Sequence, residues 1–311
     1  MPFYQSGDIC LHYVARDGER SSPNSMIFQH GIGGDLRQPG RFLVPERTGI
    51  PAGTLDIFHA DFRGHGQSEL GRAEDLSIAT LGLDLAALLD HLELGDVIVG
   101  GISMGAAAAL RLAVQCPERV RALVLCRPAW DDGPMSLEAR QAYALIADLL
   151  AAEDWRSSAL RALEQSDILR SIEAVCPDAA KSLRGQVQSV LNDPEIRESA
   201  IVRLRCLPPS RGLDDEGEGL ATVQCPALIL VAEGDPIHPF ACARKLARLL
   251  PNSRLMQIAP KSPIDDKPHL EEVDRIIGEF LCSHFDTIRR PTLPLPGEQS
   301  IQTQKGEASC N

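Results

Sequence analysis

Ser103 stands in a sequence context that favours an activated nucleophile. It is the centre of residues 101–105, Gly-Ile-Ser-Met-Gly, with an apolar run at 97–100 before them and an alanine-rich, helix-favouring stretch at 106–110 after them. A strand, a tight turn and a helix, with glycines two residues before and after the serine, form the arrangement that exposes a nucleophilic hydroxyl. The helix would direct its positive N-terminal end towards the point where an oxyanion develops. We therefore predict that Ser103 attacks a carbonyl group.

A serine nucleophile needs a base, and the base needs an orienting carboxylate. Asp235 comes just past the apolar run at 227–231, and His269 follows the last predicted strand, directly before the terminal helix. The carboxyl ends of parallel strands meet at one edge of a sheet, which would bring both side chains to the serine. The order serine, aspartate, histidine along the chain predicts Ser103, Asp235 and His269 as the catalytic residues.

Two alternatives stay open within this set. His238 is close to Asp235 in the sequence and is a second candidate for the base. Asp131 follows the preceding strand and is a second candidate for the acid. His269 is the preferred base because no other histidine lies between His238 and His284.

The elements that would position these residues alternate between strands and helices. Apolar runs predict strands at 9–14, 26–29, 55–60, 97–100, 120–126, 227–231 and 254–258, and helical spacing marks 78–92, 106–116 and 270–281. This α/β pattern favours a mostly parallel central sheet with helices on both faces. Residues 129–220 show no strand pattern and predict a helical lid between two parts of the core, 1–128 and 221–285. Residues 286–311 are predicted to be a disordered tail.

Composition excludes several classes of function. Of the 311 residues, 44% are hydrophobic and 24% charged, which is ordinary for a globular protein with a large core. The net charge of -12 argues against binding to nucleic acid or to an anionic membrane. No signal peptide, membrane-spanning run or paired-cysteine pattern is visible, which favours a cytoplasmic location. No cysteine and histidine spacing suggests a metal, and the glycines at 31–34 lack the spacing of a nucleotide-binding loop, so we expect no cofactor. The oligomeric state is not readable.

Three segments together resemble the signature segments of the α/β-hydrolase superfamily: residues 30–34 (His-Gly-Ile-Gly-Gly), 61–68 (Asp-Phe-Arg-Gly-His-Gly-Gln-Ser) and 101–105. The similarity covers about residues 9–283 and is to the branch with lactonases, esterases, C–C bond hydrolases and cofactor-free haloperoxidases. It implies the α/β-hydrolase fold with a helical lid after the sixth strand. It also implies an oxyanion hole made by the backbone N–H groups of Ile32 and Met104, worth about 3–4 kcal/mol of barrier per donor.

The chain departs from that family pattern at the base. Most relatives carry the catalytic histidine in a Gly-His pair directly after the last strand. Here residues 259–263 read Ala-Pro-Lys-Ser-Pro, and His269 arrives several residues later.

The predicted function is hydrolysis of a carboxylic ester or lactone of a small, partly apolar substrate through an acyl-enzyme on Ser103. A serine at this position excludes the aspartate chemistry of epoxide hydrolases and haloalkane dehalogenases. Candidate substrate contacts are Gly33, Trp130, Tyr143 and Trp155. The alternatives are a C–C bond hydrolase or thioesterase of the same fold, or a relative that binds a ligand without turnover.

Overall fold

A single sheet forms the centre of the molecule. The computed structural model describes residues 2–16, 22–213 and 218–286, so the predicted tail lies outside the described residues from 287 onwards. The strands follow the order β1-β2-β4-β3-β5-β6-β7-β8, with β1 and β2 antiparallel to their neighbours and all later pairs parallel. Their bounds are β1 Phe3–Ser6, β2 Ile9–Ala15, β3 Ser25–Gln29, β4 Asp56–Ala60, β5 Val97–Ile102, β6 Val120–Cys126, β7 Ala227–Val231 and β8 Ser253–Gln257.

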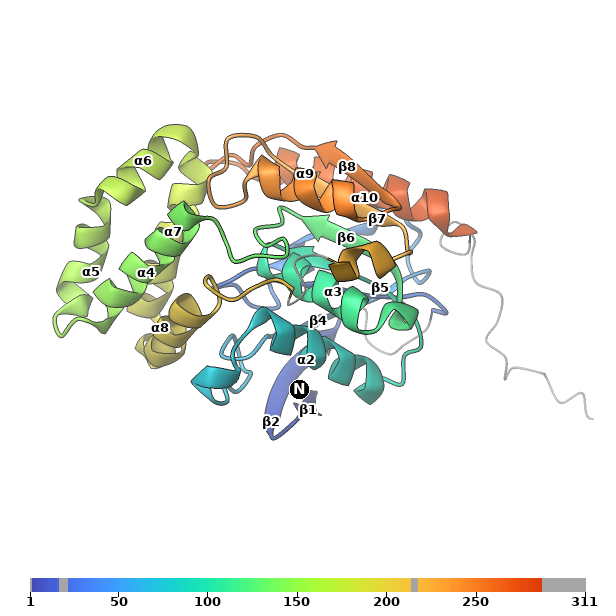
Figure 1. Ribbon diagram of the computed structural model, residues 1–311, viewed down its shortest axis with the longest axis horizontal. Helices are drawn as coiled ribbons and strands as arrows, with labels where there is room; N and C mark the ends of the chain where they lie inside the picture. Colours follow the sequence, from blue (N-terminus) through green and yellow to red (C-terminus); the bar gives the residue numbers. More distant parts are fainter. Residues whose placement is uncertain (1, 17–21, 214–217, 287–311) are drawn as a thin grey trace, which may run out of the picture.

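Helices cover both faces of this sheet (Figure 1). One face carries α2 (Ile78–His91), α3 (Met104–Gln115) and α9 (Phe240–Leu249), and the other carries α1 (Pro45–Thr48) and α10 (Lys267–His284). Neighbouring residues of one strand enter opposite cores: Ile27 packs with the α2 side, while Met26 and Phe28 pack with the α10 side. Burial on both faces explains why the strands are apolar throughout rather than alternating. The predicted fold class is confirmed.

A lobe of helices separates β6 from β7. It consists of α4 (Leu137–Ala151), α5 (Trp155–Glu164), α6 (Asp167–Val175), α7 (Pro177–Asn192) and α8 (Arg197–Cys206), which we call the helical insertion. Figure 1 shows these helices packed against one another beside the sheet. Ser136 and Ser166 accept hydrogen bonds from backbone N–H groups in the first turns of α4 and α6, so each helix begins at a serine cap.

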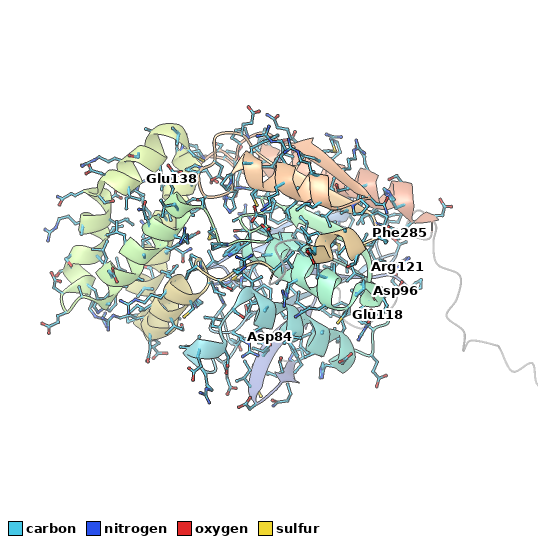
Figure 2. The ribbon with its side chains drawn as sticks, in the orientation of Figure 1. Asp84, Asp96, Glu118, Arg121, Glu138 and Phe285 are labelled. Atoms are coloured by element: carbon cyan, nitrogen blue, oxygen red, sulfur yellow. The ribbon has the colours of Figure 1, made fainter. Side chains whose placement is uncertain are left out.

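The amino-terminal end of the parallel strands is closed by a charged cluster. Arg121 of β6 lies 3.6 Å from Asp96 and stacks over the ring of Phe285 at 4.8 Å. Figure 2 places these three residues at the end of the sheet away from the helical insertion. The carboxyl ends of the strands therefore face the insertion, and in sheets of this kind ligands bind at that edge. Among the described residues, no helix is long and apolar enough to cross a membrane.

Candidate active site

Ser103 occupies a strained turn between β5 and α3. Its backbone has φ 54° and ψ -107°, a region that non-glycine residues rarely adopt. The Ser103 N–H donates to the carbonyl of Cys126 at 2.9 Å, which ties the turn to the end of β6. A β-carbon on Gly101 or on Gly105 would lie 2.7 or 2.5 Å from the carbonyl oxygen of Gln29. Both glycines are therefore required because the end of β3 passes directly beneath the turn.

His238 is the imidazole that contacts the serine. Its Nε2 lies 3.0 Å from Ser103 Oγ, and its Nδ1 lies 2.8 Å from Asp235 Oδ2. The other oxygen of Asp235 accepts the backbone N–H groups of Ile237 and His238 at 2.9 and 3.1 Å. One short turn after β7 thus fixes both the carboxylate and the imidazole. Since the carboxylate accepts the Nδ1 proton, Nε2 keeps its lone pair for the serine hydroxyl.

The expectation that His269 is the imidazole beside Ser103 is wrong. His269 is 6% exposed at the start of α10, and its ring Nδ1 donates to the carbonyl of Ala259 at 3.0 Å. It lines a cavity of about 70 Å³ together with Ile102, Arg127 and Lys261. Burial, together with the positive charges of Arg127 and Lys261, lowers its pKa. His269 is therefore hydrogen-bonded to the backbone of the loop after β8. The histidine that hydrogen-bonds to the hydroxyl of Ser103 is His238, from the loop after β7.

Asp235, predicted as the acid, is the carboxylate that hydrogen-bonds to the imidazole beside Ser103, and Asp131 is engaged elsewhere. Asp131 Oδ1 accepts the N–H of Gly133 at 2.8 Å, and its Oδ2 lies 3.5 Å from Lys245. Burial alone would raise the pKa of Asp235, but His238 and Arg127 outweigh it and hold that pKa well below its usual range. Asp235 is therefore ionised at neutral pH.

Arg127 is a site residue that sequence reasoning missed. It follows β6 with a φ of 48° and reaches Asp235 at 2.6 Å and Asp178 of α7 at 3.1 Å. Lys261 lies 3.4 Å from the second oxygen of Asp178. The guanidinium therefore shares Asp235 Oδ2 with His238 and links that carboxylate to the helical insertion. In the sequence, Arg127 is marked only as a charged residue directly after an apolar strand, and this position does not reveal which carboxylates it pairs with.

The backbone N–H groups of Ile32 and Met104 are free to face a reacting group. In the described part of the chain, no protein acceptor takes either of these N–H groups, although the neighbouring ones are engaged. The N–H of Gly31 donates to Gln38 at 2.7 Å, and that of Gly33 donates to His65 at 3.2 Å. These side chains hold the loop that carries Ile32.

The helical insertion covers this loop. Gln186 of α7 donates to the carbonyl of Ile32 at 3.0 Å and packs so closely on Gly33 that a β-carbon there would meet its amide. Ser103 is only 5% exposed. Gln186, like Arg127, was not predicted, because nothing local in a helical stretch distinguishes a glutamine that reaches a loop 154 residues away.

The three predicted aromatic contacts occupy different surroundings. Tyr143 of α4 is buried, and burial together with the negative charge of Asp235 raises its pKa. Trp130 is buried and donates to the carbonyl of Ser210 at 3.2 Å. Trp155 contacts Arg156 and Arg197, whose guanidinium groups stack over its ring at 4.7 and 5.1 Å within the insertion. Contact of each with a substrate stays a prediction.

With this fold and geometry established, comparison with known proteins identifies the class. Residues 24–264 match the family model of the alpha/beta hydrolase fold, and the chain belongs to that family. The resemblance inferred from the three signature segments is thereby confirmed, and the chain is placed among hydrolases.

Individual relatives have several activities. The chain is 27% identical to a Caulobacter sp. strain K31 protein named as a carbamate hydrolase, RutD, over 82% of this chain and 90% of the relative. It is 30% identical to 3-oxoadipate enol-lactonase 2 of Acinetobacter baylyi over 39% and 43% of the two chains. Among solved structures, the enol-lactonase of Burkholderia xenovorans LB400 has a TM-score of 0.66 at 19% identity and covers 90% of this chain and 100% of its own.

Proposed function

We propose that this protein is a serine hydrolase that cleaves a carboxylic ester or lactone of a small, partly apolar substrate. Ser103 is the nucleophile, His238 the general base and Asp235 the acid that orients it. The observation that carries the proposal is the continuous hydrogen-bonded line from Asp235 through His238 to Ser103, with spacings of 2.8 and 3.0 Å. The 3.0 Å spacing falls within the range in which a base abstracts a proton, and the 2.8 Å spacing is a hydrogen bond that orients this base.

The reaction follows from this line in two stages. His238 Nε2 takes the proton of Ser103 as Oγ attacks the carbonyl carbon, and it then gives that proton to the departing alcohol. The developing oxyanion lies between the N–H groups of Ile32 and Met104 and the positive end of α3. Water, deprotonated by the same imidazole, releases the acid from the acyl-enzyme. Asp235 remains ionised throughout and stabilises the imidazolium that forms in each stage.

The substrate class rests on the walls of the site and on the relatives. Tyr143 and Trp130 are buried aromatic side chains of the segment that follows β6, and a substrate contact with either would favour a partly apolar substrate. The insertion acts as a lid through Gln186 and Asp178, which contact the core at Ile32 and Arg127. The named relatives act on lactone and carbamate bonds, and all these carbonyl groups pass through a tetrahedral oxyanion.

Labelling with a fluorophosphonate probe tests the nucleophile. The wild-type chain should be modified at Ser103, and the Ser103→Ala variant should not be modified. The exposed Ser157→Ala variant serves as the matched control and should label like wild type. An intact chain that leaves the probe unreacted would be a ligand-binding relative without turnover, and the proposal would be abandoned.

A substrate panel then tests the bond. The purified enzyme is given p-nitrophenyl esters, an aliphatic lactone, a thioester and a vinylogous diketone. We expect the highest kcat/KM on an ester or the lactone. A clear preference for the diketone or the thioester would reassign the protein to C–C bond or thioester hydrolysis.

A further inference from the structure

A buried arginine on the helical insertion has no counter-charge. Arg203 of α8 is 5% exposed, and its guanidinium donates to the carbonyl of Gly64 and, at 3.5 Å, to Ser199. Its Nε has no hydrogen-bond partner, and across residues 2–16, 22–213 and 218–286 no carboxylate pairs with it. Burial is the sole influence on its pKa, which falls to about 10, so the group is still charged at neutral pH.

Arg63 is the other buried arginine of the described residues, and it is paired with a carboxylate, as are the partly buried Arg47 and Arg127. Arg63 forms two hydrogen bonds to Asp84, at 2.6 and 2.7 Å, and Arg47 lies 2.7 Å from Asp274. Arg127 has two carboxylates. An unpaired buried cation costs several kcal/mol, because neutral carbonyl dipoles replace only part of its hydration. The fold therefore compensates buried guanidinium groups elsewhere and leaves Arg203 uncompensated.

Arg203 is linked to the loop that carries Ile32 through a short chain of contacts. Gly64, its carbonyl partner, precedes His65, whose Nε2 accepts the N–H of Gly33 in the loop that carries Ile32. Burial, reinforced by the positive charge of Arg203, lowers the pKa of His65 well below its usual value, so this ring is neutral and supplies no counter-charge. One loop thus separates the unpaired cation from the candidate oxyanion hole.

We propose that Arg203 binds a carboxylate of the substrate while Ser103 attacks an ester or lactone carbonyl elsewhere on the same molecule. The inference rests on the proposed function and narrows it to acid-bearing substrates, such as the half-ester of a dicarboxylic acid or a lactone with a carboxylate side chain. A carboxylate presents two oxygens to the planar fork of a guanidinium and supplies the missing charge. The carboxylate would neutralise Arg203 only when the substrate is bound, so the arginine would favour substrates that carry a carboxylate.

Matched esters measure this selectivity. Mono-p-nitrophenyl succinate, glutarate and adipate are compared with p-nitrophenyl butyrate, valerate and hexanoate, which carry a methyl group in place of the carboxylate. In wild type, kcat/KM should favour at least one acidic ester over its neutral partner by about ten- to a hundredfold. Arg203→Gln should remove that preference through KM, and Arg203→Lys should keep part of it. Arg205→Gln, on the exposed side of the same helix, is the matched control and should retain the wild-type ratio.

The outcomes separate this inference from the proposed function. If no ester is hydrolysed and Ser103 does not react with the fluorophosphonate, the proposed function fails. If both ester series are hydrolysed and the acidic preference is absent, or is unchanged in Arg203→Gln, the carboxylate site is refuted while the hydrolase stands.

Thermal stability gives a second readout that does not depend on turnover. An unpaired buried charge should make Arg203→Met at least as stable as wild type, and glutarate should raise the Tm of Ser103→Ala but not of Ser103→Ala/Arg203→Met. A purely structural link to Gly64 predicts the reverse: a lower Tm in Arg203→Met and no response to glutarate. That result would overturn the inference.

Discussion

Replacing His238 and His269 in turn decides which imidazole removes the serine proton. In His238→Gln the group 3.0 Å from Ser103 Oγ is lost, and no other histidine of the described residues hydrogen-bonds to that oxygen. Loss of the base from a serine triad reduces kcat by about 10⁴- to 10⁶-fold, which is about 5–8 kcal/mol of transition-state stabilisation. We expect a loss in this range, because Asp235 is already ionised and the backbone N–H groups alone supply what remains.

His269→Gln is the matched comparison. Its ring makes one hydrogen bond, to the carbonyl of Ala259. Losing that bond costs about 0.5–1.5 kcal/mol of stability, and the rate of acylation should stay within about threefold of wild type. Both variants replace a histidine with a glutamine, so a difference between their acylation rates reflects only where the histidine lies in the structure.

Stopped-flow release of p-nitrophenol measures acylation, and urea unfolding measures stability in the same samples. Added imidazole should partly restore His238→Ala, because the truncated side chain leaves space beside Ser103 Oγ, and it should have no effect on His269→Ala. The reasoning is refuted if His269→Gln loses as much acylation rate as His238→Gln while both remain folded.

Three further changes test the surroundings of the site. Arg127→Met should lower the free energy of unfolding by up to about 3–5 kcal/mol, because Asp235 would keep only the imidazole of His238 and Asp178 only Lys261 as partners, and adding Asp178→Asn should recover part of this loss in urea titrations. Gly33→Ala should lower the free energy of unfolding by about 1–3 kcal/mol and slow acylation, because residue 33 has a φ of 75° and its new methyl group would meet Gln186. An unchanged midpoint of urea unfolding would contradict that packing. His65 has a folded pKa well below 6.5, so its contribution to stability is present above pH 6.5 and is lost as the pH falls, by at most about 1.4 kcal/mol per pH unit. His65→Gln should flatten the decline measured between pH 7.5 and 5.5, and an equally steep decline would count against a neutral ring.

The turn that carries Ser103 was predictable because its requirements are local. A buried strand, two glycines and a helix-forming stretch follow one another within residues 97–110, and the strained φ of Ser103 follows from that sequence alone. The sheet was predictable for a similar reason, since its inner parallel strands β3, β5, β6 and β7 are buried on both faces and largely apolar. β1 was missed because only its alternate residues are buried, and four residues carry too little pattern.

The imidazole beside Ser103 was mispredicted because two histidines fit the order along the chain and the choice depends on loop geometry. A local signal was nevertheless present. Asp235 is followed three residues later by His238, and an aspartate in such a turn accepts the next backbone N–H groups and draws the third residue over its own carboxylate. The position of the loop after β8, by contrast, depends on ion pairs with partners more than 80 residues away, which spacing cannot reveal.

Asp235 and His238 both lie on the turn after β7, which leaves the loop after β8 with a different role. That loop holds no group required by the proposed proton transfer, and its charges serve to join the two parts of the molecule: Asp266 pairs with Arg41, and Lys261 reaches Asp178 of the helical insertion. Asp178 in turn contacts Arg127, which shares an oxygen of Asp235 with His238. The position of the insertion therefore bears on Asp235, because any shift of Asp178 would change how strongly Arg127 competes with the imidazole for that oxygen.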